Sequence, residues 1–492
     1  MTGNAEQAQL PLIIQGGMGI GVSDWRLARA VSQRGQLGVV SGTAIDSVFV
    51  RRLQDGDIGG HVRRAMSAFP MPGVAAAALA RYFRPEGRGR DMPYQLLPMY
   101  RQIATRKREA LTMLAAFVEI FLAREGHDNP VGINLLTKVQ RPNLATLYGA
   151  MLAGAGYVLM GAGIPREIPG VLAALAQNLP ASLRYEVQGL PSGMDVRITL
   201  DPGSYWSGAP RVLQRPKFLA IVASNSLATM LARKGGGGVD GFVIEGPTAG
   251  GHNAPPRGDP QFNSRGEPQY GSRDDVDLVR MRELGLPFWI AGGAGSPDAL
   301  RRARDAGAAG IQVGTLFAFS DESGVVPALK QSVLASAALR EVDVFTDPLA
   351  SPTGYPFKVV HWSHEPVPAV ERQRICDLGY LRAPYWTPDG RIDYRCPAEP
   401  VAAFVNKGGD IGETVGRRCL CNALMANIGL PQVREDGSIE SQLLTSGDDL
   451  KEIATFTAGR SHYTAGDVID YLLGSPRTVS VPEPGWPSPE SA

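Results

Sequence analysis

Short apolar runs recur along the first 313 residues, and glycines or small polar residues follow each run. The runs stand at 10–14, 37–40, 131–136, 157–160, 218–222, 241–245, 288–291 and 310–314. Between them, apolar positions return at helical spacing, as in 24–33, 225–234 and 297–306. Continuous apolar strands that alternate with helices are typical of a parallel sheet covered by helices. Eight such units favour an α/β fold of the TIM (β/α)8 barrel type over an open doubly wound sheet.

Two segments interrupt the alternation, and it stops near residue 320. Residues 45–130 have a helical pattern rich in Arg and Ala, whereas 176–216 alternate like a two-stranded excursion in "YEVQGL" and "DVRITL". We therefore expect a barrel at 1–320 with insertions at about 45–130 and 176–216. A C-terminal extension of mixed structure would occupy 321–475. The proline-rich residues 476–492 predict a disordered tail.

Composition and charge exclude several classes of protein. Hydrophobic residues make up 44% and charged residues 20% of the chain, as in a folded protein. The net charge of +1 offers no electrostatic attraction for nucleic acid or an anionic membrane. No stretch has the roughly 18 uncharged apolar residues of a membrane span, and the N-terminus lacks the pattern of a signal peptide. We predict a cytoplasmic protein without nucleic-acid or membrane partners.

Glycine clusters follow the first, seventh and eighth predicted strands. In a (β/α)8 barrel the loops after the strands form the functional face, and the last two commonly bind phosphate through backbone N–H groups. Consecutive glycines also let a flat ligand lie against the main chain, and a neighbouring methionine offers it a soft apolar surface. The clusters are "QGGMG" at 15–19, "GGAG" at 292–295 and "GT" at 314–315.

A lone histidine, His252, stands in "GPTAGGHNAPPRG" directly after the sixth predicted strand. Gly250 and Gly251 allow close approach of the backbone, and imidazole is the side chain that moves protons near neutral pH. A glycine-rich turn with a surface histidine is the alternative. The chain has no HExxH or GxSxG motif, and no GxGxxG or GxxxxGKS/T in the required context.

Five motifs in order resemble the FMN-dependent nitronate monooxygenase (2-nitropropane dioxygenase) family. They are "PLIIQGGMGIGVS", "GINLL", "GPTAGGHN", "WIAGGAG" and "QVGTLF", and the resemblance covers roughly residues 11–320. The FMN-dependent enoyl-ACP reductases share this barrel and are also similar. The resemblance implies a flavin-dependent oxidoreductase with FMN as its cofactor.

The resemblance also assigns roles to residues of this chain. It implies flavin contacts from Gln15, Gly16, Gly17, Met18 and Asn134, close passage of Gly250 and Gly251 by the flavin ring, and phosphate binding by Gly292, Gly293, Gly314 and Thr315. His252 would point at the substrate and take or hold its proton.

The implied reaction is oxidation of alkyl nitronates, with O2 as the second substrate. An NAD(P)H-linked reductase of enoyl thioesters, with an acyl carrier protein as partner, is the alternative. A flavin-binding subunit without turnover is a third possibility. The stiff "NAPPRG" after His252, where family members often continue with glycine, and the long extension put the substrate in question.

All four cysteines lie between residues 376 and 421. They are Cys376, Cys396, Cys419 and Cys421. Four thiolates suit a structural zinc ion or an iron–sulfur cluster. Their spacing does not match the CxxC pairs of common zinc sites, so four small, inert thiols are the alternative.

Overall fold

The computed structural model describes residues 10–89, 91–234, 238–365 and 372–475, and the tail predicted at 476–492 lies outside them. Eight parallel strands form one sheet in the order β1-β10-β9-β8-β7-β4-β3-β2. The strands are β1 (Ile13–Gln15), β2 (Gly38–Ser41), β3 (Val131–Leu136), β4 (Tyr157–Gly161), β7 (Lys217–Val222), β8 (Gly241–Glu245), β9 (Phe288–Ala291) and β10 (Gly310–Val313). All eight predicted runs form these strands, which confirms the predicted TIM barrel.

The sheet closes between its first and last strands. Ile14 bridges Leu37 in parallel, and the amide of Gln15 donates to the carbonyl of Leu37 at 2.9 Å. Leu37 in turn donates to the carbonyl of Ile13 at 3.1 Å. Closure leaves no exposed edge strand and brings the carboxyl ends of all eight strands around one mouth.

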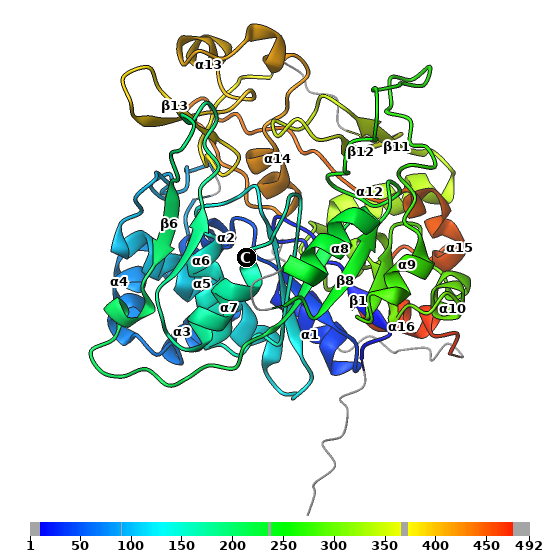
Figure 1. Ribbon diagram of the computed structural model, residues 1–492, viewed down its shortest axis with the longest axis horizontal. Coiled ribbons are helices and arrows are strands. Elements are labelled where there is room, and N and C mark those ends of the chain that lie inside the picture. The colour runs from blue at the N-terminus through cyan, green and yellow to red at the C-terminus, as the bar shows by residue number, and fades with distance from the viewer. Residues whose placement is uncertain (1–9, 90, 235–237, 366–371, 476–492) are drawn as a thin grey trace, which may run out of the picture.

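Helices surround the barrel and cross over between its strands (Figure 1). They are α1 (Trp25–Gln33), α5 (Arg106–Arg124), α6 (Asn143–Leu152), α7 (Ile168–Ala176), α8 (Asn225–Lys234), α9 (Leu278–Glu283), α10 (Pro297–Asp305), α11 (Thr315–Ala318) and α12 (Pro327–Ala338). Two of the predicted helices begin at side-chain caps: Asp24 accepts from the first turn of α1, and Ser296 caps α10 ahead of its Pro297. Within the described residues, no helix is long and apolar enough to cross a membrane.

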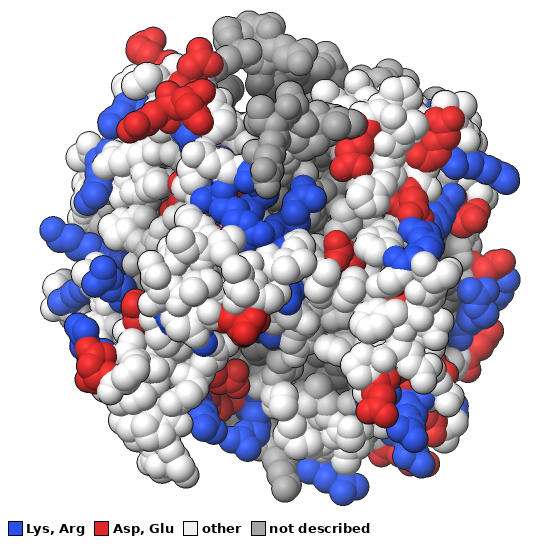
Figure 2. All heavy atoms as spheres, turned by 90° about the horizontal axis from the view of Figure 1, so that it is seen from above, with Lys and Arg blue, Asp and Glu red and all other residues white. Residues whose placement is uncertain are grey.

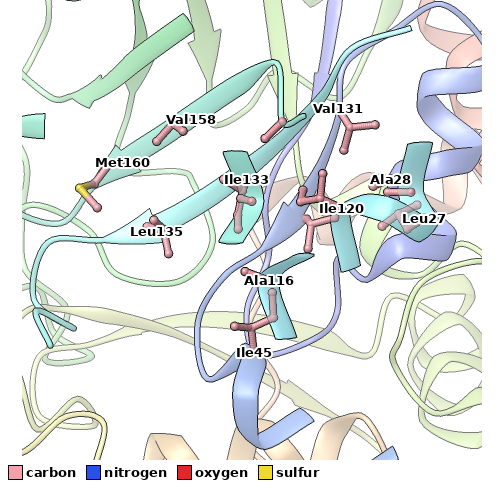
Figure 3. Close-up of a cluster of buried hydrophobic side chains, with 14 of the residues drawn as sticks. Leu27, Ala28, Ile45, Ala116, Ile120, Val131, Ile133, Leu135, Val158 and Met160 are labelled. Atoms are coloured by element: carbon pink, nitrogen blue, oxygen red, sulfur yellow. The ribbon is translucent and has the colours of Figure 1, made fainter. Parts of the chain in front are cut away.

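Alternate residues of the barrel strands pack outward against these helices. Val131, Ile133 and Leu135 of β3 and Val158 and Met160 of β4 face the helical layer, where Ala116 and Ile120 of α5 meet them (Figure 3). This apolar contact between the sheet and its helices is the larger core of the protein, and a smaller one fills the barrel interior.

The first insertion is helical, as predicted, and leads into α5. It consists of α2 (Ile45–Gln54), the 3-10 turn η1 (Ile58–Gly60), α3 (His61–Ser67) and α4 (Pro72–Tyr82). Asp46 of α2 accepts from Arg108 of α5 at 2.5 Å and also from the hydroxyl of Tyr380 in the extension. This buried carboxylate therefore ties the insertion to residues more than 300 positions away in the chain.

The second insertion contains a two-stranded excursion, as predicted, and its strands are antiparallel, although the first lies earlier than expected. Residues 181–184 (β5, Ala181–Arg184) pair with β6 (Arg197–Leu200), and the short η2 (Pro202–Tyr205) follows. Of "YEVQGL", Tyr185 continues the hairpin by donating to the carbonyl of Val196 at 2.7 Å, and the backbone after it turns to the extension. Gln188 donates to the carbonyl of Pro384 at 2.9 Å and accepts from Trp386 at 2.8 Å. A hydrophobic alternation cannot reveal which distant segment takes these hydrogen bonds.

The C-terminal extension combines two hairpins with short helices. The strands are β11 (Val342–Asp347), β12 (Phe357–Trp362), β13 (Ala383–Trp386) and β14 (Ile392–Arg395), and the helices are α13 (Val401–Asn406), η3 (Ile411–Thr414), α14 (Leu420–Asn427), η4 (Asp448–Glu452), α15 (Ile453–Thr457) and α16 (Ala465–Leu472). Figure 1 shows α13, β13 and α14 above the barrel. The last helix, α16, returns to pack against α1, α10 and α11.

The close crossing of α5 and α6 can be tested by a substitution at Gly149. A Cβ atom at this position would lie 2.1 Å from the carbonyl oxygen of Met113, so Gly149→Ala forces two helix backbones apart. We expect it to lower the free energy of unfolding by about 1–3 kcal/mol, measured by urea denaturation. The control is Gly73→Ala in α4, where a Cβ meets nothing within 4 Å; it should stabilise by about 0.4–1 kcal/mol. Equal effects of the two substitutions would contradict this packing.

Candidate active site at the barrel mouth

The interior of the barrel changes from apolar to polar at the carboxyl ends of its strands. Below the mouth it is filled by residues such as Val39, Val243 and Trp289. At the mouth, Glu245 of β8 and Gln312 of β10 are both in register with Ala291. Ser41 and Asn134 are in register with each other, and Asn134 with Leu159. Because registered neighbours face the same side of a sheet, all four polar side chains face the interior.

Several of these polar groups lack a partner in the protein. Ser41 Oγ and Gln312 Oε1 are buried atoms without a hydrogen bond in the described part of the chain. Asn134 Nδ2 donates to the carbonyl of Gly17 at 3.1 Å. Burial raises the pKa of Glu245 to about 7. Buried polar atoms without partners are unfavourable unless a ligand or water meets them, so this layer has the character of a binding surface.

The "QGGMG" loop lies against β3 and against the residue that follows β10. A Cβ atom on Gly17 would stand 2.2 Å from Asn134 Cβ, and one on Gly314 would stand 3.5 Å from Met18 Sδ. The structure thus brings Gly16, Gly17, Met18, Asn134 and Gly314 together at one side of the mouth. The side chain of Gln15 is fully buried, and its hydrogen bonds stabilise the loop. Its Oε1 accepts from the amide of Val39 at 3.0 Å, and its Nε2 donates to Ser23 Oγ at 2.8 Å.

His252 is held by the C-terminal extension. Its Nε2 hydrogen-bonds to Ser351 Oγ at 2.7 Å, and its ring meets the edge of Phe357 at a centroid distance of 4.8 Å. Ser351 is fully buried and also bonds to Thr353 Oγ1 at 2.8 Å. Burial first, and then the charge of Lys138, lower the pKa of His252 to about 4. The imidazole is therefore neutral at neutral pH and can accept a proton or a hydrogen bond.

The loops predicted to bind phosphate meet a second segment of the extension, residues 445–449. The amide of Gly447 donates to Thr315 Oγ1 at 3.1 Å, and the amide of Gly295 donates to Asp449 Oδ2 at 3.1 Å. Gly292 and Gly293 both have positive φ and lie beside Thr248 Oγ1. The structure thus brings Gly292, Gly293, Gly314 and Thr315 together, but it also places a carboxylate among them.

Gly250 and Gly251 have different surroundings. A Cβ atom on Gly250 would lie 2.7 Å from the carbonyl carbon of Ser446, so the chain's own backbone needs this glycine. Gly251 has φ of +80°, and a Cβ there would meet nothing within 4 Å. The amide of Gly251 donates to Thr445 Oγ1 at 2.9 Å, and its carbonyl accepts from the amide of Lys358 at 2.9 Å. The open space at Gly251 is the part of this loop that a ligand can approach.

Sequence reasoning missed several residues at this mouth. Glu245 could have been found by continuing the inward alternation of β8 by two positions from Val243. The sequence gives no such signal for Lys138, Ser351, Ser446 or Asp449. The last three belong to the extension, and they meet the barrel only in the folded chain.

The four predicted metal ligands are brought to one cavity. Cys376, Cys396, Cys419 and Cys421 all line one narrow cavity in the extension. Among the described residues, no group of three or more His, Cys, Asp or Glu side chains could hold a metal ion. A zinc ion bound by the four thiolates is therefore not supported.

Residues 208–347 match the family model described as nitronate monooxygenase. This segment includes β7 to β11 and His252. The match confirms the predicted resemblance and the predicted enzyme class, a flavin-dependent oxidoreductase. A search of the curated proteins found no match.

Three solved structures are similar to this chain over most of their length. FabK from Thermotoga maritima is 17% identical, with a TM-score of 0.44, and the similarity covers 94% of this chain and 92% of that chain. Nitroalkane oxidase from Streptomyces ansochromogenes is 16% identical, with a TM-score of 0.44 and coverage of 95% and 96%. The enoyl reductase domain of MlnA from Bacillus amyloliquefaciens is 10% identical, with a TM-score of 0.44 and coverage of 94% and 93%.

Glu245→Gln tests the buried carboxyl at the mouth. Burial raises the pKa of Glu245 from the ordinary 4.5 to about 7. The folded state therefore binds this proton more tightly than the unfolded state. The stabilisation is complete below about pH 4.5 and is lost as the pH rises through 7. Between pH 4.5 and 8 the wild type should lose on the order of 3 kcal/mol more of its unfolding free energy than the variant, measured by urea denaturation.

The control for this comparison is Glu435→Gln, because Glu435 is exposed. This substitution should leave the pH dependence of stability as it is in the wild type. Parallel pH profiles for Glu245→Gln and the wild type would show that Glu245 is ionised throughout.

Proposed function

We propose that this protein is an FMN-dependent oxidoreductase that oxidises alkyl nitronates with O2. The observation that carries the proposal is a neutral His252, held by Ser351 beside the polar inner layer of the barrel mouth. The family match over residues 208–347 includes this histidine and supports the same class of reaction.

The residues at the mouth fit a flavin. Open space beside Gly251 and the glycines that pack on Asn134 and Met18 permit a flat ring to lie against main chain. The unpartnered Ser41 Oγ and Gln312 Oε1 are suited to the polar edge of such a ring. Asp449 already accepts from Gly295, so we assign the phosphate to the backbone amides of Gly293 and Gly314. Bound FMN would supply the electron transfer and the reaction with O2.

The chain's own residues would bind and orient the nitronate. A nitronate is an anion, and the charge of Lys138 reaches His252 closely enough to lower its pKa. Lys138 would therefore attract the substrate to the histidine. The neutral imidazole would donate a ring N–H to a nitronate oxygen, or take the α-proton where the substrate arrives as the nitroalkane, while Ser351 holds the ring in one orientation. The Pro-rich loop after His252 would limit the size of the substrate.

Reduction of an enoyl thioester is the second function, and the charge distribution favours it. Lys and Arg side chains gather in a hollow on the face seen from above the extension (Figure 2). A positive hollow is complementary to an acyl carrier protein, which presents a phosphate-linked arm and an acidic surface. In this alternative the same flavin would accept hydride from NAD(P)H.

The two functions differ in the reductant of the flavin. The protein should purify yellow or take up one FMN per chain, because the flavin resides in the barrel mouth. Under anaerobic conditions, an alkyl nitronate should bleach the flavin absorbance quickly and NADPH should not. Bleaching by NADPH alone would favour the reductase. A flat visible spectrum after incubation with FMN would remove the flavin itself from the proposal.

His252→Ala tests the proton-handling role. Turnover should fall by ~10²–10⁴, while FMN content stays near the wild-type value because the phosphate-binding loops lie elsewhere. Ser351→Ala should lower turnover less than His252→Ala does, and it should shift the pH profile of turnover. Ser351→Thr keeps the hydroxyl, so its turnover and pH profile should stay close to those of the wild type. His361→Ala on β12 is the control, since His361 is exposed and pairs with Glu365. Loss of FMN from His252→Ala would mark the histidine as structural.

A further inference from the structure

A carboxylate of the extension lies on one of the loops to which we assign the flavin phosphate. The amide of Gly295 donates to Asp449 Oδ2 at 3.1 Å. A Cβ atom on Gly295 would stand 2.8 Å from the same oxygen, so a larger residue would push the carboxylate away. Gly295 ends the "GGAG" cluster that contains Gly292 and Gly293. The carboxylate therefore takes up an N–H group of the kind that binds phosphate.

The residues next to Asp449 hold it in this position. The amide of Gly447 donates to Thr315 Oγ1 at 3.1 Å, and the amide of Asp448 donates to the carbonyl of Thr248 at 3.0 Å. Asp449 itself lies in η4, which packs against α11. This short segment of the extension thus contacts the loops that follow β8, β9 and β10. The carboxylate is built into the barrel mouth.

The negative charge of Asp449 is not balanced by a cation. Lys358 is buried and pairs with the neighbouring Asp448 at 2.8 Å. Within the described ranges, Asp449 forms no ion pair, and the groups that affect its pKa include no cation. Burial, and then the charge of Asp448, raise the pKa of Asp449. The loops assigned to a phosphate therefore face one carboxylate more than they have cations nearby.

Other amides of the same loops remain available to an anion. Among the residues that the structure describes, the N–H groups of Gly293 and Gly314 donate to no backbone acceptor. A phosphate monoester carries roughly 1.5 to 2 negative charges at pH 7 and is a strong acceptor. The phosphate of FMN would meet attraction from these amides and repulsion from Asp449. Riboflavin has the same ring without the phosphate, so the carboxylate would affect its binding much less.

We propose that Asp449 competes with the phosphate of FMN for these loops and so determines how strongly the site prefers FMN over riboflavin. The inference rests on the proposed flavin site. The carboxylate meets the Gly295 amide as an anionic ligand would, and its charge opposes a second anion close by. FMN would therefore be an exchangeable cofactor, and the extension would control its affinity through one side chain.

The test compares binding of FMN and riboflavin to the cofactor-free full chain, followed by flavin fluorescence. Asp449→Asn keeps the shape of the side chain and an oxygen that can accept from Gly295, but it removes the charge. Its dissociation constant for FMN should fall at least about tenfold, while that for riboflavin stays near the wild-type value. Asp449→Ala also frees the Gly295 amide, so it should strengthen FMN binding at least as much.

Glu452→Gln is the matched control. Glu452 is exposed at the end of the same turn, η4, so this variant removes an equal charge away from the loops. Both dissociation constants should stay at their wild-type values. An equal gain in FMN affinity in Glu452→Gln and Asp449→Asn would overturn the proposal, because it would show a general effect of net charge. Weaker binding of both flavins by Asp449→Asn would also overturn it and mark the carboxylate as a support of the loop.

Inorganic phosphate separates this inference from the flavin proposal. Phosphate alone should raise the melting temperature of Asp449→Asn more than that of the wild type, because a ligand of the folded state stabilises it. This readout does not require the flavin ring. A phosphate effect without flavin binding would support the competition and remove the flavin. Flavin binding with an unchanged preference for FMN over riboflavin in both Asp449 variants would overturn the competition and leave the flavin proposal intact.

Discussion

The closure of the barrel is the constraint on which the rest of this structure depends. The hydrogen bonds between Gln15, Leu37 and Ile13 join the first strand to the second, while β10 pairs with the other side of β1. Closure removes the edges of the sheet and sets the carboxyl ends of the strands in a ring. Residues as distant in sequence as Ser41, Glu245 and Gln312 thereby face one interior. Without closure, the glycine loops would be separate turns.

The mouth is completed by backbone contacts from the C-terminal extension. Gly251 hydrogen-bonds to both Thr445 and Lys358, and the amide of Asp448 donates to the carbonyl of Thr248 at 3.0 Å. Lys358 then pairs with Asp448 at 2.8 Å. These contacts hold the loop that carries His252 from both sides. The extension is therefore part of the proposed site, because the orientation of the imidazole depends on Ser351.

Two different environments for ionisable groups lie close together in this region. At the mouth, burial raises the pKa of Glu245 to about 7 and lowers the pKa of His252 to about 4. Beside the cysteine cavity, Arg374 donates to the carbonyl of Thr414 at 2.8 Å and Arg417 to the carbonyl of Ser351 at 2.6 Å. Arg417 connects the two, since it binds the carbonyl of Ser351 and lies near Cys396.

The sequence by itself determined the barrel and its eight strands. Apolar runs and helical periodicity are local signals, and each strand of a barrel is buried on both faces wherever its neighbours lie. The glycine clusters likewise marked the loops at the mouth. Only the tertiary structure decided that the backbone of Ser446 packs so closely on Gly250 that a Cβ atom there would clash with it. It likewise decided that Gln188 of "YEVQGL" pairs with the extension and that Ser351 orients His252. It also decided that four scattered cysteines share a cavity. Contacts of this kind join segments tens to hundreds of residues apart, and no periodicity within either segment records its partner.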